Sequence, residues 1–359
     1  MQDVVIKILL LPFSLLYGLL VGLRSVAYRF GLLRSVQFDI PTIVVGNLSV
    51  GGTGKTPHTE YLVQLLQPYL QVGTLSRGYG RKTEGFLMVQ PDKSAEEVGD
   101  EPLQIKRKNP EVAVAVGENR IFAIPQMLMQ HPDLQTIILD DAFQHRAIKA
   151  GLNILLTEHD RPFFEDFLLP AGRLREWRSA YERADIIIVT KCPISFGEAD
   201  KQKYIRQIKP LPHQNIYFSL FKYQQPYSFF SPEFSCALQK NMDVLLLSGI
   251  AKTDYLQQYL QTQAHTVRTI EYADHHFFEE KELDDLRQTY ADMSAQAATE
   301  GRKVMILTTE KDATRLERHR RFLHSHQLPM WVLPATVVFH FDESRNFDAH
   351  IKSFLLQFR

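Results

Sequence analysis

Residues 46–57 read GNLSVGGTGKTP, and the interpretation of the whole chain starts from this stretch. Its end, Gly54-Lys55-Thr56, is typical of a phosphate-binding loop, although the usual pattern G-x-x-x-x-G-K-[ST] has glycine where this chain has Ser49. In such a loop the backbone N–H groups bind phosphates, the lysine reaches the outer phosphates and the threonine binds Mg²⁺. The predicted nucleotide-binding residues are Ser49, Val50, Gly51, Gly52, Thr53, Gly54, Lys55 and Thr56.

The surroundings of the loop favour this interpretation over a chance glycine-rich turn. Residues 41–47 predict a short buried strand, and residues 58–70 predict the following helix, with Pro57 in its first turn. Strand-like runs also occupy residues 71–76, 111–116, 136–140, 152–157 and 185–190. Because helical patterns separate several of them, the expected fold is α/β: a P-loop NTPase-like, mostly parallel sheet with helices on both faces.

The length of 359 residues exceeds one typical domain. Residues 243–250 and 303–309 repeat the strand pattern after an aromatic-rich stretch, which predicts a smaller C-terminal α/β domain. The predicted parts are an N-terminal membrane-associated helix at 1–35, a P-loop domain at 36–192, linker or hinge strands at 193–240, and a C-terminal α/β domain at 241–359, whose last segment could pack back on the first domain.

Charge and cysteine content limit the classes of function. The formal net charge is 0, which argues against a protein that binds nucleic acid by bulk charge. Cys192 and Cys236 have no metal-ligand spacing and predict two reduced thiols in a cytosolic setting.

The N-terminus is unusually apolar. From Ile8 to Leu23, 16 residues pass without a charge, which falls short of the roughly 20 that span a bilayer. Pro12 is expected to weaken a continuous helix, and no clear cleavage site of a signal peptide follows. With Arg24 and further arginines beyond it, the pattern favours an interfacial helix on a membrane, with a single span and a buried core helix as alternatives.

Residues 136–146, TIILDDAFQHR, place two aspartates at the end of an apolar strand, as in a Walker B element. Asp140 is the better candidate for the Mg²⁺ shell, and capping of a following helix is the alternative for both aspartates. Gln144 and His145 could orient a substrate or a phosphate, but taken alone they are more typical of a helix surface.

Two further acidic and histidine clusters have more than one interpretation. Asp100 and Glu101, in VGDEPLQI, either cap a helix or supply a carboxylate as base or metal ligand. His275, in YADHHFFEEKEL, is a surface, catalytic or metal-binding histidine, and no third ligand with suitable spacing is evident.

Arginines lie beside glycines in LSRGYGRK, GENR and PAGRLREWR. Arg77, Arg120 and Arg173 fit a site that recognises an anionic substrate through bidentate contacts, although any single arginine is more often a surface residue. TTEKDATRL, at residues 308–316, is only weakly similar to a base-reading loop and is at least as typical of a helix N-cap.

Taken together, these blocks resemble the tetraacyldisaccharide 4'-kinase family, the lipid A 4'-kinases of Gram-negative bacteria. Ala142 and Trp177 depart from the glycine and proline of many members. The resemblance implies a kinase that moves the γ-phosphoryl group of ATP to the 4'-hydroxyl of a lipid-anchored disaccharide 1-phosphate, with a C-terminal domain that closes over the nucleotide. The matching pieces, from residue 46 to residue 313, are GNLSVGGTGKTP, LSRGYGR, GDEP, LDDAFQHR, LLPAGRLRE, VTK, ADHHFF and TEKDA.

The resemblance also implies a catalytic pair, Asp100 and His275. In the resulting hypothesis Asp100, polarised by His275, accepts the proton of the sugar hydroxyl. The predicted Mg²⁺ ligands are Thr56 and Asp140, with Glu101 as a further candidate. The remaining predicted site residues are Asp141 and His145 in catalysis and Arg77, Arg120, Gln144 and Arg173 in substrate binding.

The expected cofactors are ATP and Mg²⁺, and the expected partners are the lipid-anchored disaccharide 1-phosphate and the membrane surface, with no nucleic acid and no obligate protein partner. The expected location is the cytoplasmic face of the bacterial inner membrane. Two other classes compete with the kinase: a P-loop ATPase or GTPase of the metallochaperone or partner-switch type, and a membrane-associated nucleotide-binding scaffold.

Overall fold

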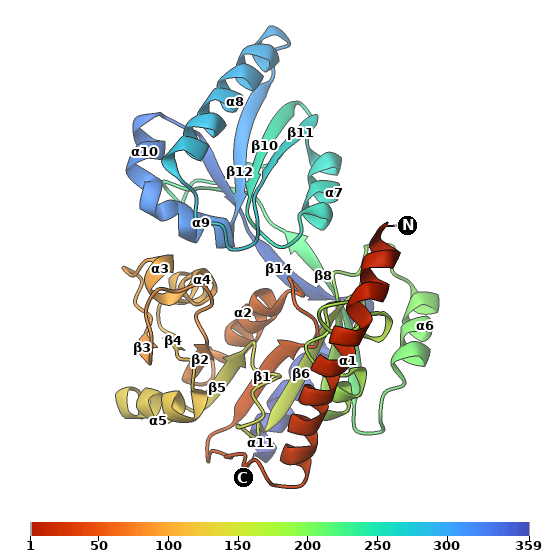
Figure 1. Cartoon of the computed structure of the whole chain (residues 1–359). Coiled ribbons are helices and arrows are strands. Elements are labelled where there is room, and N and C mark those ends of the chain that lie inside the picture. Colours follow the sequence, from red (N-terminus) through yellow and green to blue (C-terminus); the bar gives the residue numbers. More distant parts are fainter. Residues whose placement is uncertain (1, 359) are drawn as a thin grey trace.

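The phosphate-binding loop lies at the carboxyl end of a central strand in a large, mostly parallel sheet (Figure 1). The structure, a computed structural model, describes residues 2–358. All strand pairs in this sheet are parallel except those of the two edge strands. In spatial order the strands are β14 (Ala335–Phe339), β8 (Asn215–Tyr223), β7 (Ile186–Thr190), β6 (Leu152–Glu158), β1 (Thr42–Asn47), β5 (Thr136–Asp140), β2 (Val72–Ser76), β4 (Ala113–Val116) and β3 (Leu87–Met88).

Helices cover both faces of this sheet. Met127 and Tyr204, from two of them, belong to the core on one face, while Leu62, Leu103 and Ile351 belong to the core on the other. The predicted α/β fold is therefore confirmed. The helical segments of this larger unit are α2 (Lys55–Leu66), α3 (Ala95–Val98), α4 (Asp100–Lys108), α5 (Arg120–Gln130), η1 (Phe163–Glu165), η2 (Arg178–Arg183), α6 (Glu198–Ile208), η4 (His340–Asp342) and α11 (Ser344–Gln357).

A second, smaller α/β unit packs its own core around a five-stranded sheet. Its strands, in spatial order, are β11 (Thr266–Glu271), β10 (Met242–Ser248), β12 (Lys303–Thr309), β13 (Met330–Leu333) and β9 (Tyr227–Ser228), of which only β9 is antiparallel to its neighbour. Its helical segments are α7 (Asp254–Gln263), α8 (Glu280–Thr299), α9 (Glu310–Leu316), η3 (Glu317–His319) and α10 (Arg320–Ser325).

The chain passes between the two units twice, along β8 and β14 (Figure 1). Residues 193–240, expected as linker strands, instead include α6 and β8, and β8 is a full strand of the larger sheet. The last segment, β14 and α11, packs on the larger unit, where Phe339 and Phe347 join the same core as Leu62. The aromatic alternation of β8 predicted a strand, but its place in the large sheet depends on pairing with β7 and the distant β14.

Helix α1 (Gln2–Arg29) docks on the larger unit along one face. The Ser14 hydroxyl donates to the Leu168 carbonyl at 3.0 Å and accepts from the Ala171 N–H at 2.9 Å. The Trp177 indole N–H donates to the Gly18 carbonyl at 2.8 Å. A Cβ at Gly18 would lie 2.5 Å from the indole ring, so the close approach requires glycine there.

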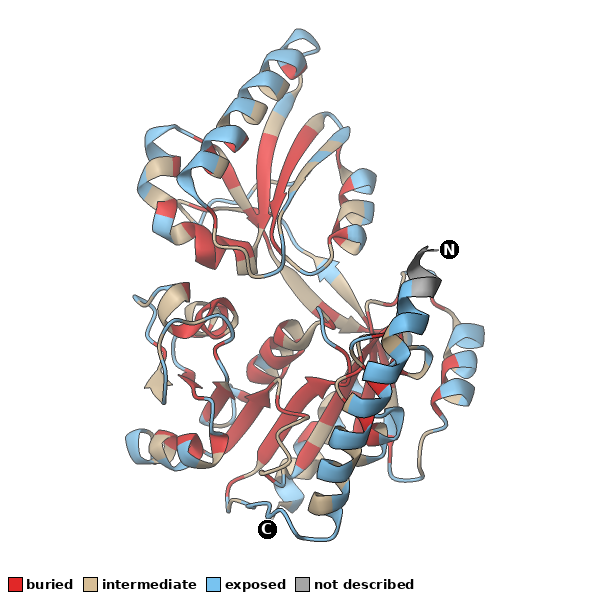
Figure 2. Cartoon of the chain, viewed as in Figure 1, coloured by how far each residue is buried: buried red, intermediate tan, exposed pale blue. Residues whose placement is uncertain are grey.

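The opposite face of α1 is exposed and apolar (Figure 2). The helix continues through Pro12, which was expected to weaken it, and docks on the protein from Ser14 onward. Residues 6–29 are long and apolar enough to cross a membrane by length and composition, and only 11% of the helix window is buried. A buried core helix is therefore excluded. The exposed side chains include Ile8, Leu9, Phe13, Leu15, Leu16, Leu19, Leu20 and Leu23.

Candidate functional site

The phosphate-binding loop takes its shape from two glycines and from an adjacent segment. Gly51 and Gly54 have φ values of 109° and 86°, in the left-handed region that side chains disfavour. A Cβ at Gly54 would also lie 2.7 Å from the Phe221 ring. Ser49, by contrast, has no positive φ and forms an antiparallel bridge to Leu174, so the loop does not need glycine at that position.

A cavity of about 440 Å³ lies between the loop and the smaller unit. Lys55, the first residue of α2, lines it with only long polar contacts: its Nζ is 3.4 Å from Asn47 Oδ1 and 3.9 Å from Asp141 Oδ2. The facing wall comes from the loop before α7, from Asp274 and His275, and from the start of α9. The ammonium of Lys55 is therefore available to an anion in the cavity.

Asp140 and Asp141 end β5 beside the loop in very different surroundings. Asp140 is buried and accepts a hydrogen bond from the Thr59 hydroxyl at 3.2 Å. Burial, followed by the nearby Glu101 carboxylate, raises the pKa of Asp140 to about 7. Burial also acts to raise the pKa of Asp141, but Lys55 and Arg175, whose Nη2 lies 2.8 Å from Asp141 Oδ1, lower it to about 2.

The residues around Asp140 fit Mg²⁺. Within residues 2–358, no group of three or more His, Cys, Asp or Glu side chains could hold a metal ion. A P-loop Mg²⁺ site needs no such group, because the ion takes one or two carboxylates, a hydroxyl, phosphates and water. Burial, together with the nearby carboxylates, disfavours ionised Asp140, and a cation bound beside Thr56 would favour it.

Asp140→Asn is expected to stabilise the nucleotide-free protein at pH 8. The folded state holds the Asp140 proton more tightly than the unfolded state, with a pKa of about 7 against an ordinary 3.8, so stability falls as the pH rises between these values. At about 1.4 kcal/mol per unit, the amide would recover up to about 4 kcal/mol. Calorimetry should show a higher Tm at pH 8 and a gain that shrinks toward pH 4. The exposed Asp133→Asn is the control; a gain independent of pH would contradict this explanation.

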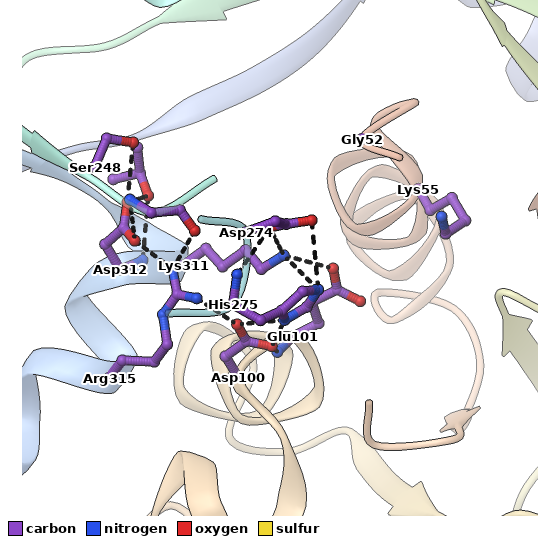
Figure 3. A network of polar contacts seen from close by, with 12 residues as sticks. Gly52, Lys55, Asp100, Glu101, Ser248, Asp274, His275, Lys311, Asp312 and Arg315 are labelled. Carbon is purple, nitrogen blue, oxygen red and sulfur yellow. Dashed lines mark hydrogen bonds and ion pairs between the residues drawn. The ribbon is translucent and has the colours of Figure 1, made fainter. Parts of the chain in front are cut away.

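A second set of groups faces the loop across the cavity (Figure 3). Asp100, the buried first residue of α4, lies with Oδ2 3.0 Å from Nδ1 of His275 in the smaller unit. Burial acts to raise the pKa of Asp100, but the hydrogen bond from His275 and the charges of Lys311 and Arg315 outweigh it, and the net shift is downward. The carboxylate is therefore held ionised and in contact with an imidazole.

Sequence reasoning missed several cations of this site. Arg175 bridges Asp141 and Asn47, Lys191 donates to the Gly52 carbonyl at 2.5 Å, and Arg315 places Nη1 3.4 Å from Asp100 Oδ2. Lys191 and Lys311 lie inside the blocks VTK and TEKDA that support the family resemblance, and this membership could have identified them as site residues. Nothing in the local sequence distinguished Arg175 from Arg173.

The arginines expected to bind substrate occupy different surroundings. Arg120 is buried and donates through Nη2 to the carbonyls of Asp140 and Asp141, at 3.1 and 3.2 Å, so it supports the end of β5. Arg173 is paired with Asp166 at 2.8 Å. Arg77 lines a second, more open cavity of about 460 Å³.

Gln144 and His145 lie in a turn, not on the helix surface that was one interpretation of them. The Gln144 amide donates to the Asn47 carbonyl at 2.9 Å. Burial, followed by the charge of Arg120, lowers the pKa of His145 to about 4, so its imidazole is neutral at pH 7. Glu101 and His275 line the cavity, and the buried Asp100 contacts His275. Gln144 and His145 do not line it, and the Gln144 carbonyl accepts from Arg24 of α1 at 3.1 Å.

Comparisons with known proteins match this geometry. The model of the tetraacyldisaccharide-1-P 4'-kinase family matches residues 6–355. The chain belongs to this family. A tetraacyldisaccharide 4'-kinase of Flavobacterium johnsoniae is 42% identical over 348 residues, covering 97% of this chain and 96% of the relative. One from Bacteroides fragilis is 40% identical over 352 residues, covering 95% of this chain and 91% of the relative.

A solved member of the kinase family has the same fold. The crystal structure of LpxK from Aquifex aeolicus, in complex with ATP, is similar with a TM-score of 0.72 and 28% sequence identity, over 98% of this chain and 99% of that one. The resemblance inferred from the sequence blocks is therefore confirmed. Membership of a kinase family also disfavours a metallochaperone or partner-switch NTPase.

Proposed function

We propose that the chain transfers the γ-phosphoryl group of ATP to the 4'-hydroxyl of a tetraacyldisaccharide 1-phosphate, a step of lipid A and lipopolysaccharide biosynthesis. The observation that carries this proposal is the Asp100–His275 pair, which joins the two units, with His275 lining the same cavity as Lys55. A general base opposite a phosphate-binding loop is what phosphoryl transfer to a hydroxyl requires. Family membership supplies the class of acceptor.

Each group has a role in this proposal. Residues 49–56 bind the phosphates of ATP, and Lys55 contacts the outer ones. Thr56 and Asp140 would hold Mg²⁺, which offsets phosphate charge when bound. Glu101 is the weaker candidate ligand, because Lys311 Nζ already lies 3.2 Å from its Oε1. Asp100 takes the proton of the attacking hydroxyl.

The acceptor would enter from the side of the second cavity. Arg77 is our candidate for direct contact with an anionic group of the acceptor, because it lines that opening. Arg120, Gln144 and Arg173 act through the neighbours that they hold. Asp141 keeps Arg175 beside the phosphate loop, and His145 offers a neutral imidazole nearby.

The exposed face of α1 supports a location at a membrane. We place the chain at the cytoplasmic face of the bacterial inner membrane, with the apolar face of α1 in the bilayer and the acyl chains of the acceptor retained there. Local concentration of enzyme and acceptor on one surface then replaces a search in solution.

One assay tests the function. The full-length protein, in detergent with Mg²⁺, is incubated with γ-labelled ATP and a tetraacyldisaccharide 1-phosphate. Label in the lipid supports the kinase. Release of phosphate alone would identify an NTPase, and neither product would point to a nucleotide-binding scaffold.

Leu16→Glu with Leu20→Glu is expected to release the protein from vesicles of anionic lipid and to leave ATP binding unchanged. Both leucines are 59% exposed on the face of α1 that does not dock, and two charges there oppose burial in hydrocarbon. Vesicle co-sedimentation should fall at least about tenfold, since each charge costs roughly 1 kcal/mol or more near a bilayer. The matched control, Leu356→Glu, changes a leucine 87% exposed on α11. Equal losses in both variants would refute the role of α1.

A further inference from the structure

Lys311, in the first turn of α9, has a position that the proposed roles leave unexplained (Figure 3). Its Nζ lies 3.1 Å from Nε2 of His275 and 3.2 Å from Oδ1 of Asp274. The same ammonium is 3.2 Å from Oε1 of Glu101, across the boundary between the two units. The side chain is 17% exposed. A single cation therefore connects Asp274 and His275 of the DHH turn to the start of α4.

The chemistry of the two groups fixes the direction of the hydrogen bond. An ammonium has donors only, so Nε2 of His275 must accept from Lys311. A neutral imidazole carries one proton, which must then be on Nδ1. Nδ1 lies 3.0 Å from Oδ2 of Asp100, a carboxylate that only accepts. The arrangement is a chain: Lys311 donates to His275, and His275 donates to Asp100.

We propose that Lys311 is a positioning residue that holds His275 in the neutral Nδ1–H tautomer and so keeps its N–H directed at Asp100. This inference rests on the proposed role of Asp100. A competing partner exists, since Oδ2 of Asp274 is 3.7 Å from Nε2 of His275. Without Lys311, Asp274 would attract a proton to Nε2, as a carboxylate that is the sole neighbour of a ring nitrogen does.

The surroundings keep Lys311 charged. Burial alone would lower the pKa of its ammonium, but Glu101, Asp100 and Asp274 outweigh burial and raise it. This ammonium lies 3.1 Å from Nε2 of His275 and can only donate to it.

The tautomer has a defined part in the transfer step. The acceptor O–H bond breaks as its oxygen forms a bond to the γ-phosphorus, the bond from that phosphorus to the ADP oxygen breaks, and the proton passes to Asp100. Throughout, the Nδ1–H of His275 donates to Asp100 and orients the carboxylate, while the imidazole gains no proton. His275 itself adopts φ of 60°, a left-handed conformation. The backbone N–H of His275 donates to Asp274 Oδ1 at 3.1 Å, and Lys311 contacts the same oxygen. Lys311 and the backbone therefore hold the same turn.

Nitrogen NMR of the full-length protein, labelled at histidine and held in detergent micelles without nucleotide, tests the proposal. Assignment of His275 comes from the signal lost in His275→Asn. The expected result is a neutral ring protonated at Nδ1. A ring protonated at Nε2, or an imidazolium at pH 7.5, would overturn the proposal whatever the activity of the protein is.

Variants separate positioning from packing. Lys311→Met should shift the His275 signal toward Nε2 protonation and lower kcat about 100-fold, with the KM for ATP changed less than about threefold. Lys311→Arg, which keeps a cationic donor, should retain the Nδ1–H signal and recover at least about a tenth of the activity. Lys281→Met, an exposed lysine on α8, is the control. An unchanged His275 signal in folded Lys311→Met would refute the tautomer role, even if kcat fell.

Discussion

Asp100→Asn is expected to lower kcat by about 10³-fold while the affinity for ATP stays within about twofold of the wild type. A carboxamide cannot take a proton from the acceptor hydroxyl, and general-base catalysis contributes about 10²- to 10⁴-fold. Among the described residues, no hydrogen bond joins Asp100 to residues 49–56, so the binding of phosphates should not change. Rapid-quench single turnovers, together with a separate ATP titration, measure the two quantities.

The same variant has a defined structural control. Arg315 keeps its ion pair with Asp312 and its hydrogen bond to the Gly249 carbonyl at 2.9 Å, so the smaller unit should retain its fold without Asp100. The Tm should therefore stay close to that of Asp133→Asn, an exposed substitution in the larger unit, to which Asp100 also belongs. A large fall in ATP affinity, with normal turnover of the bound enzyme, would show that Asp100 is not the base.

Local patterns were sufficient for the larger fold and for the phosphate loop. The apolar run of β5 ends at Asp140, and the strand of residues 41–47 leads into glycines whose backbone no other residue adopts easily. Both features depend on neighbours in sequence. Ser49 departs from the usual sequence pattern of the loop, but its backbone conformation does not require glycine.

Features that depend on distant contacts could not be predicted. The return of β14 to pair with β8, and hence the true composition of the hinge, depends on register between segments more than 100 residues apart. Arg120 and Arg77 occur in similar Gly-rich contexts, yet one is buried under Asp140 and the other lines an open cavity. Burial of a charge is decided by packing, which composition does not reveal.

The cations of the catalytic side were hidden for the same reason. Lys311 and Arg315 occur one turn apart in TEKDATRL, which predicted an ordinary capped helix, and Thr309 does cap α9 by accepting from the Asp312 N–H. Their function emerges only where α9 meets α4 across the two units. Residues 309–316 thus both cap a helix and supply two cations of the site, and only the cap could be predicted from the sequence.

Lys55→Met is expected to lower kcat/KM for ATP by about 10³-fold or more. Among residues 2–358 the wild-type ammonium has no polar partner closer than 3.4 Å, so it is not needed to hold Asn47 or Asp141 in place. Its contribution is to the phosphates, where a buried charge-assisted contact contributes about 2–3 kcal/mol to binding and more as charge develops in transfer. Isothermal titration with ATP and steady-state kinetics separate the two parts.

The Tm of Lys55→Met, measured with and without ATP, distinguishes a lysine that contacts phosphate from one that stabilises the fold. Because Arg175 still pairs with Asp141 at 2.8 Å, Lys55→Met should leave the Tm of the nucleotide-free protein unchanged while the stabilisation by ATP is reduced. Lys149→Met, exposed on the same unit, should lose neither. Lys55→Arg should recover little, because the larger planar guanidinium cannot replace a compact ammonium at the start of α2. If Lys55→Met lowered the Tm of the nucleotide-free protein but kept the stabilisation by ATP, Lys55 would be a structural residue and not a phosphate ligand.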